Sequence, residues 1–325
     1  MNWMKSKIFW RWTIAIAITI FIFVFFCFLP KLLPLCLKYI YGVEDIDEGC
    51  VAMQNYGLLG DSYGIFNAFF SALAFIAVVR TLYLQQQNGK KASLIDRFYK
   101  MLDYQDNLIN DMTILPVGKS KKETEKPIIG RKAFVEYKTQ LKYLTRAVSE
   151  VSKNNNLELS KTKIADIAYA VFYYGADKNR TDLMFDYLKD YPDKAVIVNG
   201  INSLLESTYK RYALNRSNQN YLGVYFRNLY NTIKVIDSAN INILDNEEKK
   251  EYIKILRARL SNAELYVLFF NLLSRFGKKW IDNGYIEKYE LIQNLPTMYC
   301  DGYNPQDYFK TIQFESEGKC SSPFS

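Results

Sequence analysis

The feature that most constrains this chain is a pair of apolar runs near its N-terminus. Residues 8–29 contain a single charged side chain, Arg11, and residues 63–79 contain none. Because a helix rises about 1.5 Å per residue, roughly 20 apolar residues cross the hydrocarbon core of a bilayer. The second run reaches this length if its helix continues to Leu84 and the Arg80 side chain extends to the headgroups. The two runs predict a transmembrane hairpin within residues 1–85, with spans at about 8–29 and 63–84.

Each run also has a second interpretation. A basic start and an apolar centre are typical of a signal peptide, but the first run is long for one, and Phe28-Leu29-Pro30 lacks the small residues of a cleavage site. The second run is alternatively a buried core helix, although its apolar residues cover every face of the helix. We prefer a membrane span for both runs.

The distribution of positive charge predicts the orientation of the hairpin. Lys and Arg precede the first run and follow the second, whereas the loop between them, residues 30–62, has two Lys and five acidic residues. Lys and Arg near span ends favour the cytoplasmic side. We therefore expect a membrane protein with both termini in the cytoplasm and the loop outside. Cys36 and Cys50 in the outer loop either pair as a disulfide or remain free thiols.

Beyond Gln85 the apolar residues recur with helical periodicity and without convincing strand alternation, which predicts an all-α cytosolic domain over residues 86–295. The expected helices are 93–113, 134–151, 161–174, 181–190, 194–214, 221–239, 246–276 and 280–294. An acidic start, a basic end and Gly277 favour one continuous helix over 246–276. Residues 296–325, rich in Gly, Ser, Asn and Asp, are expected to form an irregular C-terminal tail.

The chain contains no histidine, which excludes Ser/His/Asp and Cys/His catalytic arrangements and His-based zinc sites. It has no recognised phosphate-binding glycine loop or nucleophile motif. We therefore expect no catalytic residue, no metal and no cofactor. If the protein were a tethered nuclease-like toxin, scattered carboxylates would have to bind its metal: Asp166, Asp186, Glu206, Asp237 and Glu264. The net charge of +8 suits either ordinary solubility or affinity for anionic lipids or nucleic acid.

Two patterns in the C-terminal half are the most distinctive. One is Tyr225-Phe226-Arg227-Asn228-Leu229-Tyr230, and the other begins at Tyr252 and continues to Gly277. Together with the two apolar runs and the Gln-rich segment 85–87, they resemble the AbiC-like family of bacterial phage abortive infection proteins. The resemblance implies a role in phage defence and leaves the biochemical reaction open. Val224 stands where members of the family often have a His before the Tyr-Phe-Arg.

The polar residues of these patterns have two interpretations. On a single helix, Arg257 and Glu264 would share a face, and Arg259 would neighbour Asn262. The residues then form either a recognition pocket for an anionic ligand or partner, or a buried polar network that fixes helix packing. The candidate set is Tyr225, Arg227, Tyr230, Arg257, Arg259, Asn262, Glu264 and Asn271.

The favoured hypothesis for function is a membrane-acting defence effector that forms a homo-oligomer in the lipid bilayer once its cytosolic domain is triggered or released. Candidates for close helix packing and membrane action are Asn67, Ser71, Ala72, Ala74 and Arg80. The alternatives are a non-enzymatic scaffold or sensor that binds nucleic acid or a defence partner, and the tethered toxin. The layout is similar to that of two-span effectors of retron systems, which implies a reverse transcriptase with its RNA–DNA product as a partner and a phage component as a trigger.

Overall fold

The computed structural model describes residues 48–115, 126–176, 181–210 and 214–315. The first predicted span, residues 8–29, lies outside the described residues, as does Cys36, so both the hairpin and the disulfide stay predictions. The chain divides into two units, residues 1–85 and 86–325, and each is described by itself.

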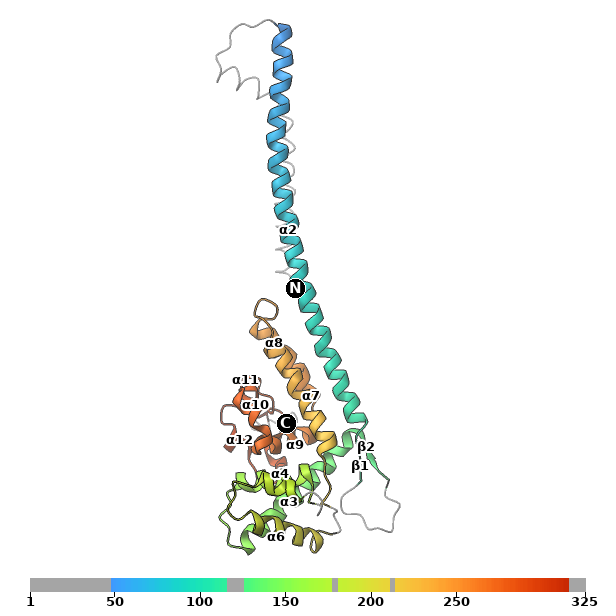
Figure 1. The fold of residues 1–325 in the computed structure, drawn as a ribbon, viewed down its shortest axis with the longest axis vertical. Helices are drawn as coiled ribbons and strands as arrows, with labels where there is room; N and C mark the ends of the chain where they lie inside the picture. Colours follow the sequence, from blue (N-terminus) through green and yellow to red (C-terminus); the bar gives the residue numbers. More distant parts are fainter. Residues whose placement is uncertain (1–47, 116–125, 177–180, 211–213, 316–325) are drawn as a thin grey trace, which may run out of the picture. The chain divides into compact units, whose positions relative to one another are not determined.

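One long helix, α2 (Glu48–Asn110), includes residues of both units (Figure 1). It joins the predicted span at 63–84 to the predicted helix at 93–113 without a break. The expectation of a loop up to residue 62 is wrong for residues 48–62, which are helical. These residues include no proline. Gly57 and Gly60 lower helix propensity by about 1 kcal/mol each, but they keep the backbone N–H donors that a helix needs.

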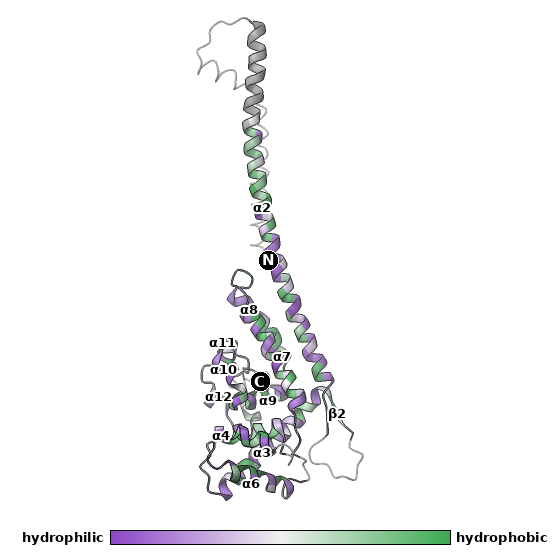
Figure 2. Cartoon of the chain, viewed as in Figure 1, coloured by the Kyte–Doolittle hydropathy of each residue, from purple (hydrophilic) through white to green (hydrophobic). Residues whose placement is uncertain are grey.

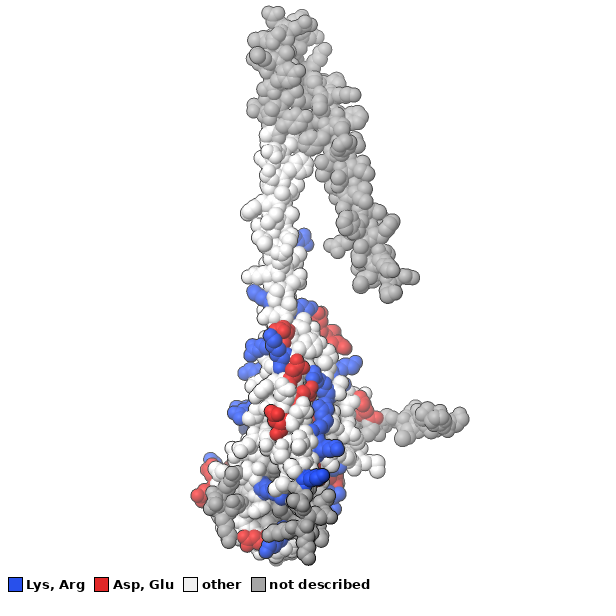
Figure 3. Space-filling view, turned by 90° about the vertical axis from the view of Figure 1, so that its right-hand side faces the viewer, with Lys and Arg blue, Asp and Glu red and all other residues white. Residues whose placement is uncertain are grey.

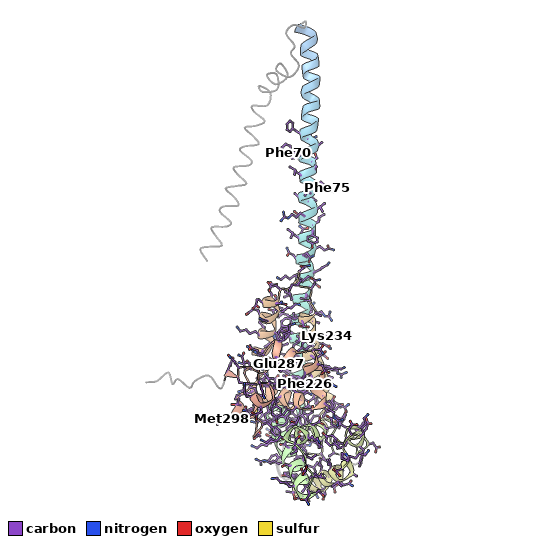
Figure 4. All side chains as sticks on the ribbon, turned by 90° about the vertical axis from the view of Figure 1, so that its left-hand side faces the viewer. Phe70, Phe75, Phe226, Lys234, Glu287 and Met298 are labelled. Carbon is purple, nitrogen blue, oxygen red and sulfur yellow. The ribbon has the colours of Figure 1, made fainter. Side chains whose placement is uncertain are left out.

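Most of the apolar stretch of α2 is exposed, and Phe66 and Phe70 within it are half-buried. From Phe66 the helix is long and apolar enough to cross a membrane, with a mean hydropathy of 1.6 in its most apolar window and none of that window buried against the described residues. Figure 2 shows the stretch as a mostly green band, and Figure 3 shows it as largely uncharged. Phe75 is 69% exposed, and Figure 4 shows Phe70 and Phe75 standing off the ribbon.

This exposure disfavours the core-helix alternative, because the core helix of a water-soluble domain is mostly buried. Among the described residues α2 is the one helix of this length and apolarity. The described residues thus contain one helix that is long and apolar enough to cross a membrane, and the two-span hairpin stays a prediction.

The second unit is built mainly from short and medium helices (Figure 1). They are α3 (Ala133–Asn154), α4 (Lys161–Tyr174), α5 (Thr181–Tyr187), α6 (Lys194–Glu206), α7 (Gln219–Asp237), α8 (Asn246–Ala258), α9 (Asn262–Leu273), α10 (Lys278–Asp282), α11 (Tyr285–Lys288) and α12 (Pro305–Tyr308), with the 3-10 turns η1 (Gly130–Lys132), η4 (Arg275–Gly277) and η5 (Thr297–Tyr299).

The core of this unit is centred on α9, in which every residue from Ala263 to Leu273 is buried. α9 packs against α3 and α4, and α3 in turn packs against α4 and α6. Phe98 and Leu102, near the C-terminal end of α2, belong to the same core. The domain is therefore helical throughout its core, as the periodicity predicts.

One small departure from the all-α prediction is a two-stranded antiparallel pair, β1 (Thr113–Ile114) and β2 (Ile128–Ile129). Thr113 pairs with Ile129, and Ile114 pairs with Ile128. Each strand has two residues, too few for the alternating pattern by which a strand is recognised in a sequence.

The expectation of one helix over 246–276 is wrong. The chain leaves the helix after Ala258 and starts a new one at Asn262, where Ser261 is the N-cap. The Ser261 side chain accepts a hydrogen bond from the Glu264 N–H, and the Glu264 side chain accepts one from the Ser261 N–H. This reciprocal capping box stabilises a new helix start. Residues on the two sides of the break therefore do not follow one helical spacing.

The segments after α9 also differ from expectation. The predicted helix over 280–294 is divided into α10 and α11, with Gly284 between them at a φ of 65°, a left-handed conformation that suits glycine. The predicted irregular tail from residue 296 contains η5 and α12, and Tyr303, Phe309, Ile312 and Phe314 are buried in the core. Up to residue 315 it is part of the packed domain.

Candidate functional site

Glu264, in the first turn of α9, is the centre of a buried polar network. Its side chain is 1% exposed. Its Oε1 accepts a hydrogen bond from the Tyr225 hydroxyl at 2.9 Å, and its Oε2 accepts one from the Ser261 hydroxyl at 2.6 Å. Burial, and then the negative charge of Glu264, raise the pKa of Tyr225 well above its ordinary value. The Tyr225 hydroxyl is therefore a constant donor to this carboxylate.

Arg131, Arg259 and Asp106 form ion pairs at the solvent-facing side of this network. Arg131 Nε lies 3.7 Å from Glu264 Oε2, and Arg131 Nη1 donates to the Arg259 carbonyl at 2.9 Å. Arg131 Nη2 lies 3.5 Å from one oxygen of Asp106, and Arg259 forms an ion pair with the other. The two cations and two carboxylates thus neutralise one another.

Gln105 and Asn228 extend the network between α2 and α7. The Asn228 Nδ2 donates to Gln105 Oε1 at 2.6 Å and to the Met101 carbonyl at 3.0 Å. The cavity beside this network measures about 10 Å³, room for one water at most. For Tyr225, Arg259 and Glu264 the geometry favours a structural network over a ligand pocket.

Two other predicted residues lie apart from this network. Arg257 donates from Nη1 to the Glu290 carbonyl at 3.0 Å and so joins α8 to the segment after α11. Asn262 is exposed at the start of α9. The predicted pairings of Arg257 with Glu264 and of Arg259 with Asn262 depend on a single helix, and the break before α9 removes that premise.

The remaining three predicted residues, Arg227, Tyr230 and Asn271, line a different and open pocket of about 620 Å³. Its walls come from α4, α7, α9, η4 and α10. The same pocket is lined by Lys234 and Lys279, and its described lining residues include no Asp or Glu. Figure 4 marks Phe226 and Lys234, which lie on this side of α7. This is a positively charged hollow of ligand size.

Asn271 has an unusual environment in this pocket. Its side chain is 3% exposed, and its Nδ2 donates to the Tyr169 hydroxyl at 2.8 Å. Its Oδ1 has no hydrogen-bond partner among the described residues. A buried amide oxygen without a partner is uncommon in folded proteins, because its desolvation is not compensated.

Gly277 lets the turn after α9 pack closely against the end of that helix. A Cβ at this residue would lie 2.4 Å from the Leu272 Cα and 2.5 Å from the Asn271 carbonyl oxygen. Only glycine permits this close approach of the turn to the end of α9. The approach places Phe276 and Lys279 beside Asn271 in the pocket lining.

A second cluster surrounds Asp166 on α4. Asp166 accepts hydrogen bonds from the hydroxyls of Tyr187 and Tyr191 and from the Arg275 N–H, and it forms an ion pair with Arg275 at 3.3 Å. It lines an open pocket of about 700 Å³ whose lining has both signs of charge. Its carboxylate is fully engaged, so this cluster joins α4 to α5 and η4.

The carboxylates considered for a tethered enzyme do not form one site. Asp166 lies in the α4 cluster, Glu264 in the buried network, and Asp237 pairs with Lys288 and Tyr289. Within the described residues no group of three or more Cys, Asp or Glu could hold a metal ion. Asp186 and Glu206 lie on α5 and α6.

The candidate membrane residues Asn67, Ser71, Ala72, Ala74 and Arg80 are all exposed on α2. At 100° per residue, Asn67, Ser71 and Ala74 lie on one face of the helix, and Ala72 lies on another. The small and polar side chains thus form one narrow stripe.

Sequence reasoning missed Arg131, Asp106 and Gln105 in the network, and Lys234 and Lys279 in the pocket. None of them is distinctive by its neighbours in the sequence. The Ser261–Glu264 spacing, a capping-box signal before an apolar run, was a usable sign of the new helix start.

The comparisons with known proteins bear on the same part of the chain. Residues 217–299 match the family model described as putative phage abortive infection protein, which confirms the family resemblance. The matched segment contains α7 to α11, and with them Glu264 and most of the residues that line the pocket of Arg227, Tyr230 and Asn271. Neither the comparison with curated proteins nor that with solved structures gave a match.

Proposed function

We propose that this protein is a membrane-anchored phage-defence effector that acts at the bacterial inner membrane, with both termini in the cytoplasm. The observation that supports the proposal most directly is the joint presence of an abortive-infection domain at 217–299 and an exposed apolar helix from Phe66. The first feature suggests the biological role, and the second suggests the place of action.

The mechanism that we propose is disruption of the membrane by an oligomer. One or two helices cannot enclose a pore, so several copies have to associate. The stripe of Asn67, Ser71 and Ala74 offers a surface on which helices can approach closely and form an interhelical hydrogen bond. Infection, or loss of a restraining partner such as a reverse transcriptase with its RNA–DNA product, would start the assembly.

The continuity of α2 suggests how the domain would control the membrane segment. The same helix contains the apolar stretch and the residues Phe98, Gln105 and Asp106, which pack or bond within the helical domain. We propose that a change in how α7 and α9 hold these residues reaches the apolar stretch through this helix.

A matched pair of substitutions tests the oligomer. Ala74→Leu places a larger side chain on the small stripe, whereas Ala72→Leu makes the same change on a different face. We expect Ala74→Leu to lose protection against phage and the loss of membrane potential that accompanies it, while Ala72→Leu keeps both. Both variants are measured with a potential-sensitive dye during phage challenge, at equal amounts of protein in the membrane.

Two results are required for the proposal to hold. Cells with the unsubstituted protein have to lose membrane potential before phage release, and the two variants have to differ. An unchanged potential in cells that still abort infection would contradict the membrane mechanism. Phe75→Arg places a charge in the apolar stretch. If this variant protects against phage as well as the unsubstituted protein does, the result would favour the tethered-enzyme alternative.

A further inference from the structure

We propose that the open pocket lined by Arg227, Lys234 and Lys279, here called the basic pocket, binds a nucleotide: an aromatic base with at least two phosphate charges. This ligand goes beyond the proposed membrane action, and its binding does not depend on that action. Three features of the lining point to the ligand, one for each of its chemical parts.

The first feature is uncompensated positive charge. Arg227 and Lys234 lie on the same side of α7, two turns or about 10 Å apart along the axis, and Lys279 comes from α10. All three are exposed, and none has an ion pair within the described residues, whereas Lys142, Lys288 and Arg275 each pair with an Asp. Separated cations of this kind attract a ligand with several phosphate oxygens.

The second feature is an aromatic lining. Tyr230 meets Trp280 edge to face with ring centroids 5.3 Å apart, and Tyr173 lies against Phe276 at 4.5 Å. All four side chains line the basic pocket. Flat apolar surfaces such as these stack on a base, whichever base it is.

The third feature is the buried amide of Asn271. The Nδ2 of this amide donates to the Tyr169 hydroxyl, and its Oδ1 has no hydrogen-bond partner among the described residues. The edge of a base presents N–H donors and ring acceptors in the geometry that an Asn side chain recognises. A bound base would thus supply the hydrogen bond that the described structure lacks at Asn271.

The size of the pocket separates a nucleotide from a nucleic-acid strand. A volume of about 620 Å³ lies within the usual range of roughly 300–1,000 Å³ for small-ligand sites. The cations and aromatic residues are gathered in this one hollow. A strand would instead require a groove that follows several successive phosphates.

The test is binding of radiolabelled ATP, GTP, CTP and UTP to the full-length protein in lipid nanodiscs. Inorganic triphosphate, the four nucleosides and a 20-nucleotide single strand are the competitors. The variants are Arg227→Gln, Lys234→Gln and Lys279→Gln, each at an exposed position. Lys254→Gln on α8 is the matched control, because Lys254 is exposed and does not line the basic pocket.

We expect at least one nucleoside triphosphate to bind, with affinity lowered about tenfold by each of the three pocket variants and unchanged by Lys254→Gln. Inorganic triphosphate should compete at least about tenfold more weakly than the nucleotide, because it lacks the base.

Three results would overturn the proposal. One is the absence of binding by all four nucleotides. Another is inorganic triphosphate that competes as well as the nucleotide, which would make the pocket a plain anion site. The third is tight binding of the single strand alone, which would assign the surface to nucleic acid. Phage protection is measured separately, so failure of either proposal is recognised without the other.

Discussion

At the scale of single residues, the structure divides a set of polar residues that are close in the sequence. Tyr225 and Arg227 are two positions apart, which is about 200° around a helix, so they point to opposite sides of α7. Tyr225 is buried against Glu264, and Arg227 lines the basic pocket. Tyr225 therefore belongs to the buried polar network, whereas Arg227 lines an open pocket.

Glu264 gives a prediction at this scale. Glu264→Ala would leave the Tyr225 and Ser261 hydroxyls without their acceptor and Arg131 without one of its two carboxylates. We expect the free energy of unfolding to fall by about 2–4 kcal/mol. Urea unfolding of the full-length protein in detergent, followed by circular dichroism, measures the change.

Glu251→Ala is the control, because Glu251 is an exposed acidic residue on α8. It should change stability by no more than about 0.5 kcal/mol. Equal effects of the two substitutions would show that the network around Glu264 does not stabilise the fold.

At the scale of elements, close backbone approaches and ion pairs set the positions of the short helices. The turn at Gly277 holds η4 and α10 against the end of α9, and Asp237 at the end of α7 pairs with Lys288 of α11. These helices are too short to be stable alone. Their positions depend on such contacts and on burial of residues such as Trp280.

Gly277→Ala tests the close approach. The new Cβ would overlap the backbone of Asn271 and Leu272, and neither atom can move without displacing α9. We expect a loss of about 1–3 kcal/mol in the free energy of unfolding. Gly89→Ala in α2 is the control, since a Cβ there meets nothing within 4 Å, and alanine favours a helix. A neutral Gly277→Ala would contradict the packing described here.

Asp237 gives a pH-dependent prediction. Partial burial tends to raise its pKa, but hydrogen bonds from Lys288 and Tyr289 outweigh this and lower the pKa. A carboxylate with a lowered folded-state pKa stabilises the fold above its unfolded pKa, and this contribution is lost as the pH falls through the folded-state value. Asp237→Asn should therefore cost about 1 kcal/mol at pH 7, and progressively less as the pH falls below about 3.9, the ordinary pKa of an Asp.

The measurement is the difference in melting temperature between Asp237→Asn and the unsubstituted protein across that pH range. A difference that persists unchanged in acid would rule out the ion pair as its cause.

At the scale of the whole molecule, the protein combines a helix that has a long, exposed apolar stretch with a domain that has its own aromatic core. We expect the protein to stay in the membrane fraction after alkaline carbonate extraction. In spheroplasts, we expect external protease to leave residues 86–325 intact, because the excess of Lys and Arg around the predicted spans predicts a cytoplasmic location for them.

The permeabilised sample is the control for this topology, and protease should then cleave the domain. Cleavage in intact spheroplasts would reverse the predicted orientation. Release by carbonate would show that the exposed apolar stretch is covered by protein and not by lipid.

The helical class, the apolar run of α2 and the abortive-infection patterns could be predicted from the amino-acid sequence, because each of these is a local pattern of residue types. Helical spacing predicted the helices that form α3, α4 and α7, and the family patterns lie in the segment 217–299 that the family model matches. Fold class and family could thus be predicted before any coordinates.

Which residues contact one another became known from the folded structure alone. Arg131 and Asp106 reach Arg259 and Glu264 from segments more than a hundred positions away, and Lys279 joins Arg227 through a turn that only Gly277 allows. The break before α9 also turned one expected helix face into two separate sites. The physical reason is that local patterns report a residue's own helix, whereas a pocket or a buried network depends on packing between helices that are distant in the sequence.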